Sequence, residues 1–474
     1  MRKRALALTL ALAAGAAATP ASAQPRPRWD TQLLARIQAP GYPASAYPHP
    51  NGRVYVGTYA NPQGDAFPSR VFEFDPDSGS LLRSWTLRGQ DLAAEHGVQA
   101  ATSDAAGRLV LLDRSPPRAL ILDTRTGEFT RYSTFADLKP CGSGGPAGSC
   151  SPTSQDLVPM PNYAAWGPGG ELYVSDFQQG VVWRVPPGGG AATVWLADRR
   201  LDGQQFGTTG LALAADRRTL IVGQGSSGGL GSVANPSTGK LYKVPVGADG
   251  SPGEMTQLWE SGPAELPDGF GIARSGRIYV ALFNANQIGV VGPDGAEIER
   301  FPAGTGGQNG SPAPFDSPSS AKFLGTRLMV PNQSYLNGDP QNMTVLDVET
   351  GEPGLPEYIP PGAGGVDSSA PVLSRISLRR AGVRAGTAAV LRVGLNEPAR
   401  LTISVEQQRG VRWRRVVTYA RPGRAGANTV RVSTRIKRSG RRRPLAPGSY
   451  RLVLRATDGA GNVSRTGVRL LRVR

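Results

Sequence analysis

Histidine and cysteine are scarce in this 474-residue sequence, and their scarcity limits the sites that the chain can build. Only two histidines are present, His49 and His96, which excludes a zinc centre held by three histidines. The two cysteines, Cys141 and Cys150, flank a Gly/Ser/Pro segment that cannot form a regular element. In an oxidising compartment this spacing predicts a disulfide that pins a surface loop. The alternative, a reactive thiol or a metal pair, has no His or third Cys nearby in the sequence.

Long apolar runs are also missing, apart from residues 5–18. That run follows three basic residues and leads into small residues that end at Ala23, an order typical of a secretory signal peptide over 1–23. The run is too short to span a bilayer comfortably, and no cysteine follows the cleavage site to carry a lipid. We therefore expect a secreted or extracytoplasmic chain that has no transmembrane span and is soluble from Gln24 onward.

Long helical patterns are absent as well, whereas turn-forming residues are abundant. The chain contains 62 Gly and 41 Pro, and its hydrophobic content of 39% is still enough for folded cores. This mixture favours an all-β protein with many turns. A chain of 474 residues is too long for one ordinary core, so we expect two or more domains.

A unit made of a tight turn and a β-branched or aromatic strand recurs six times in the front of the chain. Each copy precedes a strand–turn–strand segment that is typical of a β-hairpin. One four-stranded sheet cannot bury both of its faces, whereas radial packing of six such sheets buries them and protects their edges. The sequence therefore predicts a six-bladed β-propeller over residues 31–359. The turn–strand units occupy 51–58, 106–113, 169–176, 217–224, 275–282 and 325–332, and the blades lie near 31–88, 96–138, 160–200, 207–260, 267–302 and 316–359.

The composition changes abruptly after a Pro/Gly/Ser linker at 360–369. Residues 370–474 contain seven short candidate strands, several of which alternate apolar residues with Arg. This number of strands in about a hundred residues is typical of an immunoglobulin-like or fibronectin type III-like β-sandwich. The segment 445–464 resembles the penultimate hairpin of bacterial surface domains of this type, a resemblance that concerns the fold and not the function.

The positive charge of the chain is concentrated in this second domain. Of the residues after Ser369, 25 are Lys or Arg and 3 are Asp or Glu, whereas the formal charge of the whole chain is +17. The cations are not interleaved with aromatic residues, so the pattern does not favour nucleic acid as the partner. Outside the cell an anionic cell-envelope polymer is the expected partner, and the alternative is a merely solvated basic face.

A propeller binds ligands at the mouth of its central channel, where the starts of the inner strands converge. Aligning the six repeats places one residue of each blade at this mouth. In four blades it stands ten positions before the inner-strand residue of the turn–strand unit (Val54, Leu109, Leu172 and Ile278), and in the fourth blade the match allows for one extra residue in the turn. The sixth blade contributes Pro318, beside Ser317, at this place. The other five residues are Ala44, Gln99, Asn162, Thr209 and Asp268.

Three segments of the repeats resemble the senescence marker protein (regucalcin)/gluconolactonase family. They are PNYAAWGPGGELYVSD (161–176), PDGFGIARSGRIYVAL (267–282) and SPSSAKFLGTRLMVPNQS (317–334). Family members are six-bladed propellers with a divalent metal in the channel, often calcium, and known activities include hydrolysis of sugar lactones and related esters. The resemblance implies that Asn162 and Asp268 bind the metal and that Asp268 is the catalytic acid/base.

The chain departs from the family pattern in two blades. Ala44 stands near the place where the first blade of the family supplies a Glu ligand, and Thr209 stands where some relatives have Asn. Gln99 would partly compensate, so the expected metal ligands are Asn162, Asp268, Gln99 and Thr209. Oxygen ligands of this kind suit Ca²⁺ better than Zn²⁺.

Two functions remain open at this point. The first is a metal-dependent hydrolase that acts on a small lactone or ester in the channel, and the PN and PDG motifs favour it. The second is a non-catalytic NHL-like binding propeller that the basic sandwich tethers to the cell envelope, and Ala44 favours it. Asn and Asp before a strand are also common turn residues, so each has a structural alternative to a ligand role. We take the hydrolase as the leading hypothesis.

Overall fold

The computed structural model describes residues 26–143, 149–203, 206–226, 238–365, 370–397, 399–438, 441–457 and 463–474. Nearly all regular structure in these residues is β, and the only helical turns are η1 (Cys141–Ser143) and η2 (Arg199–Leu201). No helix among them is long and apolar enough to cross a membrane. The expected signal peptide, residues 1–23, lies outside the described residues.

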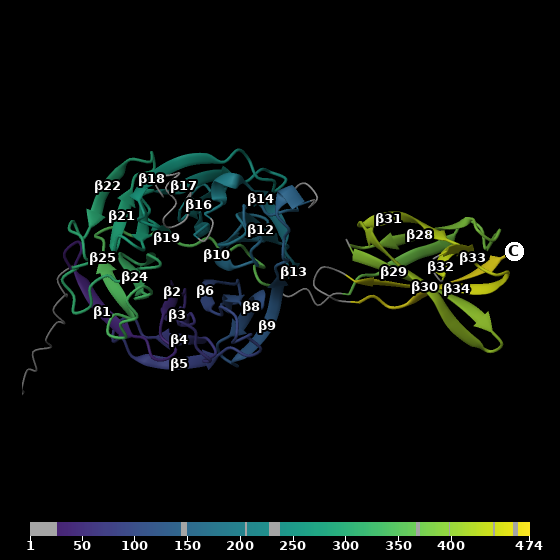
Figure 1. Cartoon of the computed structure of the whole chain (residues 1–474), viewed down its shortest axis with the longest axis horizontal. Coiled ribbons are helices and arrows are strands. Elements are labelled where there is room, and N and C mark those ends of the chain that lie inside the picture. The colour runs from purple at the N-terminus through teal and green to yellow at the C-terminus, as the bar shows by residue number, and fades with distance from the viewer. Residues whose placement is uncertain are drawn as a thin grey trace, which may run out of the picture.

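Six four-stranded antiparallel units form a ring around a central channel (Figure 1). Blade one contains β2 (Pro43–Pro48), β3 (Val54–Thr58), β4 (Arg70–Phe74) and β5 (Leu81–Thr86). Blade two contains β6 (Val98–Ser103), β7 (Leu109–Arg114), β8 (Pro117–Asp123) and β9 (Glu128–Thr134), to which β13 (Gly190–Ala191) adds in parallel. Blade three contains β10 (Pro161–Trp166), β11 (Leu172–Asp176), β12 (Val181–Val185) and β14 (Thr193–Ala197).

The remaining three blades follow the same plan, with the first strand of each lining the channel. Blade four contains β15 (Thr208–Leu213), β16 (Thr219–Gln224), β17 (Thr238–Pro245) and β18 (Thr256–Pro263). Blade five contains β19 (Pro267–Ile272), β20 (Ile278–Leu282), β21 (Gln287–Val291) and β22 (Glu297–Phe301). Blade six contains β23 (Lys322–Leu324), β24 (Arg327–Asn332) and β25 (Thr344–Glu349), and its outermost strand is β1 (Thr31–Arg36).

The membership of β1 corrects one prediction from the sequence. Residues 31–36 were expected in blade one because they directly precede it, but β1 pairs antiparallel with β25 of blade six. The N-terminal strand therefore closes the ring on the C-terminal blade. This pairing also explains why no strand follows β25 in its own sheet, where the sequence predicted a second strand of a hairpin.

The blades are held together by apolar faces that pack against their neighbours. One buried cluster joins Tyr55 and Val71 of blade one to Val98 and Leu111 of blade two, and similar clusters lie between the other blades. Because the strands of a blade are buried on both faces, they read as near-continuous apolar runs. This is the radial packing that the repeat pattern predicted.

The second domain is a β-sandwich. One sheet consists of β26 (Leu373–Leu378), β28 (Ala388–Leu395) and β31 (Gly426–Ser433). The other consists of β27 (Gly382–Val383), β35 (Gly467–Val473), β34 (Gly448–Thr457), β29 (Ala399–Arg409) and β30 (Arg412–Gly423), and a separate ribbon pairs β32 (Arg435–Arg438) with β33 (Arg441–Pro444). Both sheets contribute to one buried apolar cluster. All seven candidate strands of the sequence are present; their immunoglobulin-like classification stays a prediction.

The segment between the two domains begins as part of the propeller. Residues 360–365 were predicted to belong to the linker, yet Ala363 is buried in the cluster between blades two and three. The Ala105 amide donates to the Ala363 carbonyl at 3.0 Å, and Arg108 donates to the Gly364 carbonyl at 2.9 Å. The rest of the predicted linker, 366–369, lies outside the described residues.

The two cysteines form the expected disulfide, with 4.9 Å between the Cα atoms of Cys141 and Cys150. The disulfide lies between the end of blade two and the start of blade three. The Cys141 amide donates a hydrogen bond to the Ser151 carbonyl at 2.8 Å, which closes the same loop.

Candidate functional site

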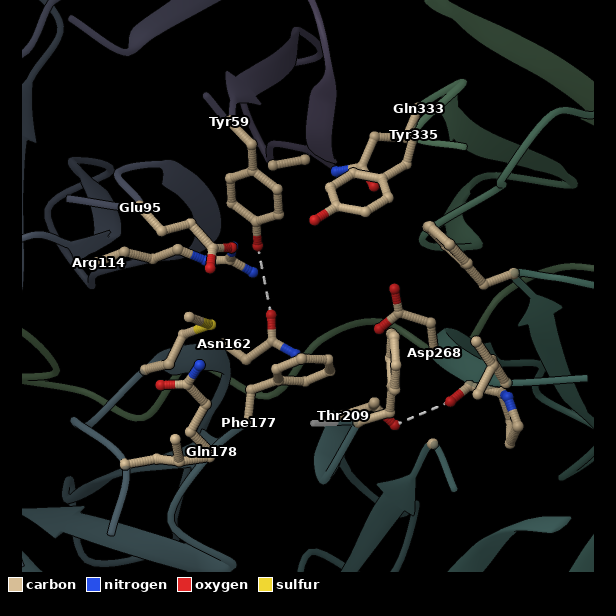
Figure 2. Close-up of a pocket in the computed structure, with 18 residues that line it drawn as sticks. Tyr59, Glu95, Arg114, Asn162, Phe177, Gln178, Thr209, Asp268, Gln333 and Tyr335 are labelled. Atoms are coloured by element: carbon tan, nitrogen blue, oxygen red, sulfur yellow. Dashed lines mark hydrogen bonds and ion pairs between the residues drawn. The ribbon is translucent and has the colours of Figure 1, made fainter. Parts of the chain in front are cut away.

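A cavity of about 330 Å³ opens at the end of the channel where the inner strands begin, and we name it the upper cavity. All six blades contribute side chains to it, and Figure 2 shows its polar groups converging from opposite walls. Its volume lies within the range of small-molecule binding pockets. The lining residues that matter below are Tyr59, Glu95, Arg114, Asn162, Phe177, Phe206, Thr209, Asp268, Phe283, Gln333 and Tyr335.

The repeat alignment placed the candidate residues correctly relative to the strands. Ala44, Gln99, Asn162, Thr209 and Asp268 are each the second residue of an inner strand. Four of them line the upper cavity. Gln99 is buried behind it, where its amide Nε2 donates to Asn162 Oδ1 and to the Tyr59 hydroxyl. The sequence therefore predicted the convergence of these side chains, although more than a hundred residues separate the outermost of them.

A second repeat position also lines the cavity, and the sequence reasoning missed it. The residue that directly follows each turn–strand unit reaches the upper cavity in all six blades. The signal was present in the same alignment, read one position past the end of each unit. It was overlooked because most of these residues are aromatic, amide or glycine and carry no obvious chemistry. They are Tyr59, Arg114, Phe177, Gly225, Phe283 and Gln333.

Arg114 brings a positive charge into the cavity. Its guanidinium carbon lies 3.6 Å from the centre of the Tyr59 ring, a cation–π contact, and Nη1 lies 2.8 Å from Glu95 Oε1. The Arg114 side chain is 8% exposed, whereas that of Glu95 is 54% exposed. Arg114 Nε is buried without a hydrogen-bond partner among the described residues, and so is Gln333 Nε2. The cavity wall therefore contains two buried donors that no described residue satisfies.

Asp268 is directed into the cavity from the wall opposite Tyr59 and Arg114 (Figure 2). Burial raises the pKa of Asp268 to about 7, while the nearby Tyr163 hydroxyl and the charge of Arg114 act in the opposite direction. Gly269 makes the Tyr163 contact feasible, because a Cβ at this position would lie 2.6 Å from the Tyr163 hydroxyl oxygen. The PDG sequence thus combines a desolvated carboxyl with the glycine that lets its partner approach.

The donor set around Asp268 does not fit a divalent metal. Asn162 Oδ1, the oxygen expected to bind the metal, already accepts hydrogen bonds from Gln99 and, at 3.4 Å, from Tyr59. The Thr209 hydroxyl donates to the Pro267 carbonyl at 3.1 Å. Among the described residues no group of three or more His, Cys, Asp or Glu could hold a metal ion. Calcium usually takes 6–8 oxygen ligands, whereas this cavity offers two carboxyl groups, Asp268 and Glu95, and Glu95 is paired with Arg114.

Comparison with known proteins found structural neighbours and no family. No protein-family model matches the sequence, and no curated protein matches it. A calcium-binding regucalcin from Agrobacterium tumefaciens is 15% identical, covers 69% of this chain and 97% of its own, and gives a TM-score of 0.45. A gluconolactonase from Xanthomonas campestris is 18% identical, with coverages of 66% and 99% and a TM-score of 0.38.

A virginiamycin B lyase from Staphylococcus aureus is 13% identical, with coverages of 67% and 98% and a TM-score of 0.40. Likenesses at this level carry no argument about activity. The propeller architecture rests on the six sheets themselves, and the chemistry rests on the residues of the cavity.

Proposed function

We propose that the propeller is a binding protein whose upper cavity takes a small lactone or ester. In this arrangement the carbonyl oxygen of the ligand accepts hydrogen bonds from Arg114, and its apolar body lies against the aromatic wall. Phe177, Phe206 and Phe283 supply that wall, and Phe177 and Phe206 stack edge to face with ring centres 5.9 Å apart.

The buried guanidinium of Arg114 is the observation that carries the proposal. A group of this kind is costly to bury unless its donors are used, and Nε has no partner among the described residues. A neutral carbonyl suits this donor because Glu95 already neutralises the charge of Arg114. A carboxylate ligand would compete with Glu95 for the same cation and would also meet Asp268 across the cavity.

Hydrolysis of the bound ligand is a second candidate, and the state of Asp268 favours it. With a pKa of about 7, Asp268 is partly ionised at neutral pH and accepts a proton from water readily. Water would add to the carbonyl carbon, Asp268 would take the proton, and Arg114 would stabilise the oxygen as it gains charge. The ring C–O bond then breaks, the departing oxygen takes the proton from Asp268, and the product is the hydroxy acid. The calcium-dependent form of this reaction lacks a fitting donor set here.

Isothermal titration calorimetry with dihydrocoumarin, a small aromatic lactone, tests the binding proposal. Arg114→Met keeps most of the side-chain volume and removes the donors, so we expect a loss of roughly tenfold or more in affinity, the usual worth of a charge-assisted hydrogen bond. Arg125→Met is the matched control, because the Arg125 side chain is 84% exposed. Equal affinity in all three proteins would overturn the proposal.

The absorbance of the ring-opened phenol separates binding from turnover. The hydrolase candidate requires that Asp268→Asn still binds the lactone but no longer opens it. If the unmodified protein binds the lactone without opening it above the uncatalysed rate, the protein is a binding module only.

We also propose that the protein is secreted and that the sandwich holds it on an anionic cell-envelope polymer. The arginines of this domain are mostly exposed, and Arg451–Glu406 is the only ion pair among its described residues. Exposed charges attract a polyanion in a way that salt screens, so adsorption to teichoic acid beads should fall between low and high ionic strength. Equal adsorption at low and high ionic strength would rule out this mechanism.

A further inference from the structure

The end of the channel opposite the upper cavity holds a second cavity, of about 430 Å³, which we name the lower cavity. It is lined by the last residues of the inner strands, including Trp166 of β10 and Phe270 of β19. Tyr163 lies between the two cavities: its hydroxyl donates to the Ser319 carbonyl at 2.6 Å, and its ring faces Lys322 on the lower side. The lower cavity is therefore a separate compartment.

A strap of chain, residues 353–358, crosses this end of the channel. The Arg274 amide donates to the Pro353 carbonyl at 2.9 Å, and the Leu355 amide donates to the Ile272 carbonyl at 2.8 Å, which ties the strap to blade five. Further along, the Arg217 guanidinium of blade four lies 4.9 Å from the centre of the Tyr358 ring. The strap thus forms one wall of the lower cavity and places Glu357 in it.

Lys322 and Glu357 both line this compartment. Lys322 Nζ lies 5.9 Å from the centre of the Tyr163 ring and has no hydrogen bond or ion pair among the described residues. Burial lowers the pKa of Lys322, and burial raises the pKa of Glu357. Glu357 Oε2 lies 2.7 Å from the Tyr47 hydroxyl, which in turn lies 3.1 Å from Ser103 Oγ.

The surroundings of the Lys322 amine and the Glu357 carboxyl group suit the condensation of an amine with a carbonyl compound. A lysine without a carboxylate on it, in a compartment walled by aromatic rings, presents a neutral amine more readily than a surface lysine does. The loss of water from a carbinolamine needs an acid, and a carboxyl group whose pKa is raised by burial holds its proton to higher pH than a surface carboxyl group does.

We propose that the lower cavity is a binding site for a small aldehyde or ketone, which Lys322 captures as an imine. The amine nitrogen adds to the carbonyl carbon, and the carbonyl oxygen takes a proton to give a carbinolamine. Glu357 then protonates the departing oxygen, the C–O bond breaks, and water leaves behind the C=N bond. The step needs no oxidant or reductant, is reversible, and does not depend on the ligand of the upper cavity.

Reductive trapping with benzaldehyde and sodium cyanoborohydride at neutral pH, followed by peptide mass spectrometry, tests this site in the full chain. The exposed Lys139 and the partly exposed Lys243 serve as internal references. We expect Lys322 to be the principal benzylated lysine, and its label to be lost in Lys322→Arg. Benzylation of Lys322 that is no faster than that of the two reference lysines would overturn the proposal.

Glu357→Gln keeps the test informative if Lys322→Arg does not fold. It should slow benzylation of Lys322 while leaving Lys139 unchanged, because only the lower cavity loses its acid. Glu254→Gln, at an exposed position, is the matched control and should change neither rate. An unchanged rate at Lys322 in Glu357→Gln would overturn the role of Glu357 as the acid.

Discussion

Replacing Asp268 by Asn should stabilise the propeller at alkaline pH, because the folded protein pays to ionise this carboxyl group. Its pKa rises from the ordinary value of 3.8 to about 7 in the folded state. Each pKa unit corresponds to about 1.4 kcal/mol, so ionised Asp268 costs the folded state up to about 4 kcal/mol. Asn keeps the shape of the side chain without this cost.

The sign of the pH dependence follows from the raised pKa. Between about pH 4 and pH 7 the folded protein holds a proton that the unfolded chain releases, so the free energy of unfolding falls as the pH rises through this window. Below about pH 4, Asp268 is protonated in both the folded and the unfolded protein, so the wild type and Asp268→Asn should have similar stability. Above pH 7 the variant should be more stable, by up to about 4 kcal/mol.

Urea denaturation of both proteins at pH 4 and pH 8 measures this difference. Asp77→Asn is the control, because the Asp77 side chain is 85% exposed. The reasoning is refuted if Asp268→Asn changes the free energy of unfolding by the same amount at both pH values. If Asp268→Asn is more stable than the wild type and no longer hydrolyses the lactone, the buried carboxyl group lowers stability in return for activity, a common trade-off at active sites.

Three further predictions concern closure, covalent linkage and metal. Removal of residues 26–36 should lower the melting temperature of the propeller sharply, because β25 loses its partner; scanning calorimetry showing an unchanged transition would contradict the closure by β1. Cys141→Ser should cost about 2–3 kcal/mol in the free energy of unfolding under non-reducing conditions, the worth of a short disulfide loop, and no loss would mean that the loop is held by other contacts. Calorimetric titration with Ca²⁺ should show no stoichiometric binding to the upper cavity, and a tight 1:1 isotherm that Asp268→Asn abolishes would restore the calcium site.

The six repeats could be predicted from the sequence because each one is a local pattern of neighbouring residues. Each turn–strand unit combines a left-handed turn residue with a buried strand, as at Gly107 with φ 74° before β7. The fourth unit reaches the same conformation without glycine, at Arg217 with φ 56°, and the alignment still found it. Local patterns of this kind depend on a few neighbouring residues and are legible in a single sequence.

Long-range pairing was harder to predict. The partner of β1 lies more than three hundred residues away, and nothing in residues 31–36 distinguishes the edge of blade six from that of blade one. Likewise, residues 360–365 read as a linker because the small side chain of Ala363 gives no sign of its burial. Such placements are decided by which surfaces remain open once the ring has formed, which is information that the local sequence does not contain.

The candidate site also has one part that could be predicted from the sequence and one part that could not. The second residues of the inner strands could be predicted, because the repeat fixes their place on the strand. The charge beside them could not: Arg114 reads as one more arginine at a strand end, and only the folded ring shows it stacked on Tyr59 of the neighbouring blade. That contact places a guanidinium in the cavity where the sequence predicted metal ligands.

A crystal structure of the protein soaked with dihydrocoumarin would test the central claim most directly. We expect the lactone in the upper cavity, with its carbonyl oxygen within hydrogen-bond distance of Arg114 and its ring against Phe177 and Phe283. A lactone bound elsewhere, or a Ca²⁺ ion held by Asn162 and Asp268 in the same cavity, would contradict it.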